Sequence, residues 1–269
     1  MRGLRARIRA AVHDLAGEPA LIYYPHAPKC AGISVAGSIA RQHYTRMERR
    51  TVPVFAMNLP ASARAAEATG REMMELREEV VAYHLALGRH RFVRAHSTCR
   101  PRLVDAFRDQ WHFVTVLRDA VARWVSEYVY NTTKASGWAA NDLGVEAYLD
   151  SRTAWTTGNT YLRYFSHLPE PPPDDLAPFT EEAVENLLRF SCVGTVEDLG
   201  EFIERFETVF GTRLSIPRKN TSPDQAMKAE IMSNPRYLER IRDLCRHDTE
   251  IYRKVVHGLR TRTGASHGV

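Results

Sequence analysis

Apolar residues along the chain form short compact runs, separated by longer segments of mixed character. Four of these runs predict buried strands, because each is apolar and is bounded by proline, glycine or polar residues. They are residues 20–24, 91–95, 111–117 and 190–194. Residues 33–43, 121–131 and 198–210 follow three of them and predict helices. Strands that alternate with helices predict an α/β fold, with a parallel sheet flanked by helices on both faces.

The remaining segments complete one predicted domain. Residues 61–88 are rich in Ala, Glu, Met and Leu and predict a helix, and the proline-rich residues 169–173 predict a surface loop. We interpret 1–269 as a single domain in three parts. These are a basic N-terminal helix within 1–18, a core over 19–225, and C-terminal helices over 226–269.

Composition and cysteine usage narrow the class of protein. The chain has 269 residues, of which 44% are hydrophobic, enough for a sizeable core. Its four cysteines lie far apart and form no C-x-x-C pair, so neither a zinc ribbon nor a disulfide framework is predicted. No run of 18 apolar residues occurs, and the basic start lacks the apolar stretch of a secretory signal. We therefore expect no membrane span and a cytoplasmic location with reduced thiols.

Positive charge is concentrated near the start of the chain. The net charge is +5, but residues 1–50 alone carry +6. This excess suits an anionic ligand, an acidic polymer or peripheral contact with a membrane surface. The alternative for residues 2–9 is a solvated basic helix face. No base-reading motif accompanies the charge, so we expect no nucleic-acid partner.

The segment Pro28-Lys-Cys-Ala-Gly-Ile-Ser34 joins the first predicted strand to a predicted helix. Its small residues let the backbone approach a ligand, and N–H groups at a helix start favour anions. Lys29 adds a charge and Ser34 a hydroxyl donor. The Walker pattern G-x-x-x-x-G-K-[ST] is absent, so Mg²⁺ is not implied. The alternative is an ordinary strand-to-helix turn with an exposed lysine.

Residues 21–34 resemble the 5′-phosphosulfate loop of sulfotransferases that use 3′-phosphoadenosine 5′-phosphosulfate (PAPS). They are most similar to the carbohydrate branch that includes the heparan sulfate 2-O- and 6-O-sulfotransferases. The matching residues are His26, Pro28, Lys29, Gly32 and Ser34. Cys30, Ala31 and Ile33 differ from the commoner sequence Thr-Gly-Gly-Thr-Ser. Because Ile33 has no hydroxyl, only its backbone N–H could serve the phosphate.

Residues 114–128 resemble the 3′-phosphate motif of the same family. Arg118, Arg123 and Ser126 match, and Ala120 stands where the family usually has proline. Arg118 ends a predicted strand, and Ser126 lies eight residues on, about two helical turns away. A guanidinium and a hydroxyl so placed can clamp a phosphate. We expect Arg123 to form a structural ion pair instead.

Weaker matches extend the resemblance over roughly residues 20–225. The stretches are Phe92–His96, Asn159–Arg163, Val193–Asp198 and Asn220–Ser222. The resemblance implies that His96 is the catalytic base and that Asn220 and Ser222 contact the cofactor. It also implies that His26, Asn159 and Arg163 bind substrate. A catalytic glutamate, as other sulfotransferase branches use, is the main rival to His96.

The resemblance implies a P-loop-like sulfotransferase fold in a soluble, bacterial-type member of the family. Residues 29–34 would hold the phosphosulfate, Lys29 would also act in catalysis, and no metal would take part. Transfer from PAPS to a carbohydrate or other hydroxyl acceptor would leave adenosine 3′,5′-bisphosphate. The motifs describe the cofactor, so the acceptor stays open, as does the oligomeric state. A nucleotide kinase and a non-catalytic module that binds anionic glycans are the alternatives.

Overall fold

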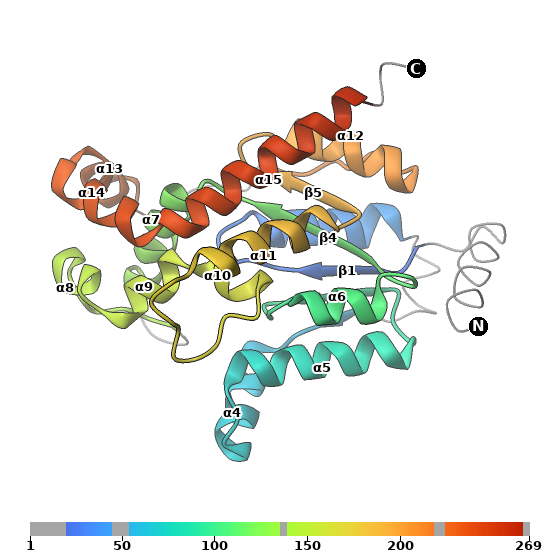
Figure 1. Ribbon diagram of the computed structural model, residues 1–269, viewed down its shortest axis with the longest axis horizontal. Helices are drawn as coiled ribbons and strands as arrows, with labels where there is room; N and C mark the ends of the chain where they lie inside the picture. The colour runs from blue at the N-terminus through green and yellow to red at the C-terminus, as the bar shows by residue number, and fades with distance from the viewer. Residues whose placement is uncertain (1–19, 45–53, 135–138, 218–223, 266–269) are drawn as a thin grey trace.

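A parallel sheet of five strands forms the centre of the molecule in the computed structural model (Figure 1). The structure describes residues 20–44, 54–134, 139–217 and 224–265. The strands are β1 (Ile22–Pro25), β2 (Phe55–Ala56), β3 (Phe92–Ala95), β4 (His112–Leu117) and β5 (Cys192–Thr195), in the order β2-β3-β1-β4-β5. The predicted α/β class and parallel sheet are confirmed, and all four predicted strands are present. β2 was not predicted, because its two residues are too few to give a periodic signal in the sequence.

Helices cover both faces of the sheet, because successive strand residues point to opposite sides. On one face Tyr23, Val93 and Phe113 pack among helices in front of the sheet in Figure 1. These helices are α5 (Met73–Leu87), α6 (Pro101–Phe107), α10 (Thr160–Phe165), α11 (Ala177–Leu188) and α15 (Arg246–Ala265). On the other face Ile22 and Val114 pack against α2 (Gly32–Ser38), the π-helical turn η1 (Ile39–His43) and α12 (Leu199–Phe210).

The predicted helix over 61–88 is two helices in the structure. The first, α4, spans Leu59–Thr69, and Gly70 ends it in the left-handed region at φ 64°. Glu72 then caps α5 by accepting a hydrogen bond from the N–H of Glu75. Helices commonly end at a glycine in this conformation. Gly70 was therefore the signal in the sequence that could have predicted the break.

A third apolar cluster lies at the carboxyl ends of the strands, on the left in Figure 1. It joins α7 (Ala120–Thr132), α8 (Val145–Leu149), α9 (Arg152–Gly158), α13 (Gln225–Ser233) and α14 (Pro235–Leu244) around the buried Trp124. The expected helical character of the C-terminal part is confirmed by α13, α14 and α15. This helical cluster forms one wall above the strand ends.

A buried ion pair ties this cluster to the rest of the fold. Arg123 on α7 is fully buried and lies 3.4 Å from Asp248 on α15 and 3.0 Å from Glu127. Asp248 also accepts hydrogen bonds from the N–H groups of Tyr161 and Leu162 at the start of α10. The expectation that Arg123 is a structural ion-pair residue is confirmed.

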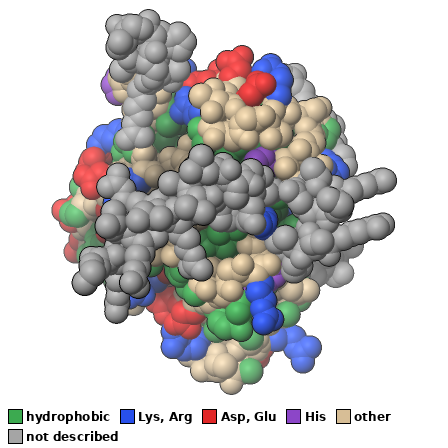
Figure 2. All heavy atoms as spheres, turned by 90° about the vertical axis from the view of Figure 1, so that its right-hand side faces the viewer, with side chains coloured by type: hydrophobic (Ala, Val, Ile, Leu, Met, Phe, Trp, Pro, Cys, Tyr) green, Lys and Arg blue, Asp and Glu red, His purple; other side chains and the backbone are tan. Residues whose placement is uncertain are grey.

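At the amino ends of the strands, acidic and basic side chains are interspersed on the described surface (Figure 2). The predicted basic helix within residues 1–18 lies outside the described residues. The predicted surface loop at 169–173 is confirmed, since most of its residues are exposed. Among the described residues, no helix has both the length and the apolar character that a membrane crossing requires.

Candidate anion-binding site

The strand order places a topological switch point between the carboxyl ends of β1 and β4. The connection after β1 leads to β2 and β3 on one side of it, whereas the connection after β4 leads towards β5 on the other. Ligands of open α/β sheets bind at such a switch point, beyond the carboxyl ends of the strands. The loop after β1 and Arg118 after β4 meet there, since Nη1 of Arg118 donates to the carbonyl oxygen of Lys29 at 3.3 Å. Two motifs 89 residues apart are thus in contact.

The backbone of the loop after β1 is strained and rich in unused donors. Lys29 and Ala31 occupy the left-handed region, at φ 61° and 55°, which non-glycine residues rarely adopt. The N–H groups of residues 29–33 donate to no atom in the described part of the chain, and the first bond of the helix is Ser34 N–H to Ala31 O, at 3.0 Å. Alternating conformations of this kind form a concave nest of N–H groups that binds anions.

Gly32 is required because His26 lies directly over it. A Cβ atom at position 32 would stand 1.8 Å from Nε2 of His26, a distance that no packing can accommodate. The N–H of His26 in turn donates to the carbonyl of Ala95 at 2.8 Å, which fixes the start of the loop to the end of β3. The match at His26 and Gly32 therefore has a direct steric cause.

His96 lies beside His26 at the same edge of the sheet. The two rings have centroids 4.0 Å apart and planes tilted by 33°. Burial lowers the pKa of His96 to about 4, and the nearby guanidinium of Arg77 adds to this effect. Burial and the neighbouring His96 likewise hold the pKa of His26 well below its usual range. Near pH 7 both imidazoles are neutral, so His96 can accept a proton.

Arg77 on α5 fixes the segment that carries His96. Its Nη1 donates to the carbonyl oxygen of His96 at 3.2 Å, and its Nε donates to Oγ of Ser62 at 2.9 Å. The side chain is almost fully buried, although arginine is rarely so. The sequence analysis missed Arg77, which looked like one of several charged residues of a helix.

The side chain of Tyr161 on α10 contacts both motifs. Its buried hydroxyl donates to the carbonyl of Arg118 at 2.6 Å, accepts from the N–H of Arg118 at 2.8 Å and lies 3.4 Å from Sγ of Cys30. Cys30 is fully buried, so its side chain points away from the loop's open side. Only its N–H remains available to a ligand. The sequence analysis also missed this role, because Tyr161 lies far from both motifs along the chain.

Two serine hydroxyls of the motifs and the Lys29 ammonium are the remaining polar groups. Oγ of Ser34 on α2 and Oγ of Ser126 on α7 make no hydrogen bond within the part of the chain that the structure describes. The ammonium of Lys29 lies 3.6 Å from the centre of the Tyr130 ring. Burial lowers the pKa of Lys29, and the carboxylate of Glu127 acts against this lowering.

The other predicted site residues differ in their exposure and in their contacts. The side chain of Ile33 is 76% exposed, so a ligand could meet it beside its N–H. Asn159 is buried, and its Nδ2 donates to the carbonyls of Trp155 and Leu244. The side chain of Arg163 on α10 makes no hydrogen bond or ion pair with a described residue, although its N–H donates to the carbonyl of Asn159 at 3.0 Å. Asn220 and Ser222 lie outside the described residues. The substrate roles of Asn159 and Arg163 stay predictions.

No family model matches this chain, and no curated protein matches it either. The functional assignment therefore depends on the residues and on their geometry.

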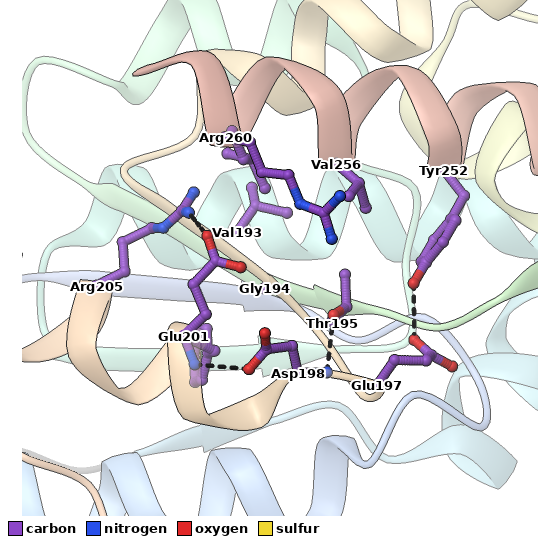
Figure 3. A pocket seen from close by; sticks show the side chains of 12 residues that line it. Val193, Gly194, Thr195, Glu197, Asp198, Glu201, Arg205, Tyr252, Val256 and Arg260 are labelled. Atoms are coloured by element: carbon purple, nitrogen blue, oxygen red, sulfur yellow. Dashed lines mark hydrogen bonds and ion pairs between the residues drawn. The ribbon is translucent and has the colours of Figure 1, made fainter. Parts of the chain in front are cut away.

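A separate hollow of about 240 Å³ lies beside the edge strand β5, between α12 and α15 (Figure 3). Its acidic groups are already bound within the fold. Glu197 accepts from Tyr252 at 3.0 Å and from the N–H of Asp119 at 3.1 Å, and Glu201 pairs with Arg205 at 2.5 Å. Arg260 reaches over the hollow from α15.

The Val193–Asp198 stretch has a structural explanation at this place. A Cβ at Gly194 would lie 2.4 Å from Phe202, so the glycine lets α12 pack closely against β5. Glu197 joins the end of β5 to the residue that follows Arg118, through its bond to Asp119. These contacts give the stretch a structural role next to the second motif.

Proposed function

We propose that this protein transfers the sulfuryl group of PAPS to a hydroxyl acceptor on a carbohydrate. The observation that carries the proposal is the contact of Arg118 with the carbonyl of Lys29, which joins a strained loop with five unused N–H groups to the second motif. Both motifs resemble those that bind the two phosphate ends of PAPS. The two motifs are in contact at a switch point of the sheet. This contact supports the resemblance, because the sequence alone does not give the distance between the motifs.

The residues present fit a ligand with anionic groups at both ends. The N–H groups of residues 29–33, with Ser34 beside them, suit the phosphosulfate end. Arg118 and Ser126 suit the 3′-phosphate, because a guanidinium and a hydroxyl can together bind a phosphate dianion. PAPS carries this second phosphate and ATP does not, so Arg118 and Ser126 would select between them.

When bound, PAPS supplies the sulfuryl group, and its sulfur–oxygen bond to the 5′-phosphate breaks as the acceptor oxygen attacks sulfur. His96 takes the proton of the acceptor hydroxyl as general base. Its lowered pKa means that it is neutral near pH 7, before the proton arrives. Lys29 stabilises the charge that develops on the bridging oxygen, since the leaving group departs with the electron pair. Arg77 holds His96 in place through its bond to the carbonyl of His96.

The test is calorimetric titration with adenosine 3′,5′-bisphosphate, beside ATP with Mg²⁺, on the wild type and on Arg118→Ala. We expect the wild type to bind the bisphosphate more tightly than ATP. The variant should lose at least about tenfold in affinity, which corresponds to about 1.4 kcal/mol. Arg108→Ala is the matched control, because Arg108 is exposed and precedes β4 at the opposite end of the sheet.

Each alternative function predicts a different result. Tighter binding of ATP with Mg²⁺ would favour a nucleotide kinase. Binding of an anionic glycan without bisphosphate binding or turnover would favour a non-catalytic module, to which the departures at Cys30, Ala31 and Ile33 could belong. Either outcome would overturn the proposal.

A further inference from the structure

Tyr130, in the last turn of α7, has an unusual environment for a surface aromatic residue. Its side chain is 43% exposed, yet two lysine ammonium groups lie against its ring. Nζ of Lys29 is 3.6 Å from the ring centre, and Nζ of Lys134 is 4.6 Å from it. The ring therefore joins the loop after β1 to the end of α7.

The two ammonium groups gain from the ring but repel each other. An aromatic face carries partial negative charge and attracts cations within about 6 Å of its centre. Burial lowers the pKa of Lys29, and the nearby Arg118 and Lys134 lower it further, whereas Glu127 raises it. Lys134 is also anchored locally, because its Nζ donates to Oδ1 of Asn131 at 3.0 Å. Two like charges held this close to a nest of N–H groups favour the binding of an anion.

We propose that Tyr130 is a positioning residue that holds the ammonium groups of Lys29 and Lys134 together beside the anion-binding loop. Two cations, instead of one, then face the phosphate- or sulfate-type group that the loop receives. This inference rests on the proposed function for the identity of that ligand. It adds Tyr130 and Lys134, which neither motif contains, to the site.

The position of the lysines can be measured without any ligand. Reductive methylation with ¹³C-formaldehyde labels lysine ammonium groups and keeps their charge. Methyl groups above an aromatic ring are shifted upfield by its ring current, so the signals of Lys29 and Lys134 should be displaced in the wild type. Lys29→Arg and Lys134→Arg assign the two signals. The displacement should persist in Tyr130→Phe, which keeps the ring, and should disappear in Tyr130→Leu.

The effect on ligand binding is measured on the same variants. Tyr130→Leu should bind adenosine 3′,5′-bisphosphate about 5- to 10-fold more weakly, a loss in the range of one partly desolvated cation–π contact. Tyr130→Phe should stay within about twofold of the wild type, since the face of the ring is unchanged. Tyr83→Leu is the matched control, because Tyr83 is 63% exposed on α5 and should alter neither readout.

The two readouts separate this inference from the proposed function. Undisplaced lysine signals in the wild type, or equal bisphosphate affinity in Tyr130→Leu and the wild type, would overturn the role of Tyr130. Displaced signals in a wild type that binds no bisphosphate would overturn the proposed function instead, and would leave the holding of the two lysines established.

Discussion

The loop at the switch point between β1 and β4 and the hollow beside β5 differ in the state of their polar groups. In the loop, five consecutive N–H groups and the hydroxyl of Ser34 make no bond within the described residues, and two lysines lie against one ring beside it. In the hollow, Glu197, Asp198 and Glu201 all accept hydrogen bonds or form ion pairs inside the fold. The hollow offers an empty volume, whereas the loop offers unused hydrogen-bond donors. Unused donors mark a site more reliably than an empty volume does, because satisfied groups gain little from a ligand.

The largest effect that would test this difference is expected from His96→Ala. Removal of a general base should lower turnover about 10²- to 10⁴-fold while the affinity for adenosine 3′,5′-bisphosphate stays unchanged. Sulfuryl transfer from PAPS to an acceptor and calorimetric titration measure the two quantities. His257→Ala, at an exposed position on α15, is the control. Full turnover in His96→Ala would show that another group acts as the base.

A smaller effect is expected from Gly32→Ala. The new methyl group would collide with the His26 ring, so the ring or the loop must shift. We expect at least about tenfold weaker binding of the bisphosphate, about 1.4 kcal/mol, because the N–H groups of a displaced loop no longer converge on the ligand. Gly144→Ala controls for a general effect of the substitution, because a Cβ there meets no atom within 4 Å. An unchanged affinity in Gly32→Ala would show that the loop does not bind the ligand.

The smallest effect is expected from Tyr252→Phe, a change in the hollow beside β5. The change removes only the hydroxyl that donates to Glu197, so the free energy of unfolding should fall by about 1 kcal/mol. Denaturant unfolding measures this loss. Calorimetric titration of the variant should give the same bisphosphate affinity as titration of the wild type. A drop in affinity of tenfold or more would mean that the hollow belongs to the ligand site after all.

The sequence predicted the strands of the sheet better than it predicted the surroundings of the site. Compact apolar runs predicted β1, β3, β4 and β5, and the small residues of the loop after β1 predicted the turn between that strand and α2. Burial confirmed the structural role expected of Arg123. These features are local, or repeat with a period that the chain itself displays.

The missed residues act through contacts between distant segments. Arg77 reaches His96 from α5, and Tyr161 reaches Arg118 across 43 residues. Nothing in the sequence near Tyr130 distinguishes it from any other helical tyrosine, because its lysine partners come from two different segments. Such roles depend on how the elements pack, and a single sequence carries no record of that packing.

The carboxylate of Asp248 has a consequence for local opening of the fold. It accepts hydrogen bonds from the N–H groups of Tyr161 and Leu162, while it belongs to α15, the last helix of the chain. Those two amide protons should therefore be protected from exchange with solvent while α15 stays packed against α10. Because Tyr161 also bonds to Arg118, this contact links the last helix of the chain to the anion-binding loop.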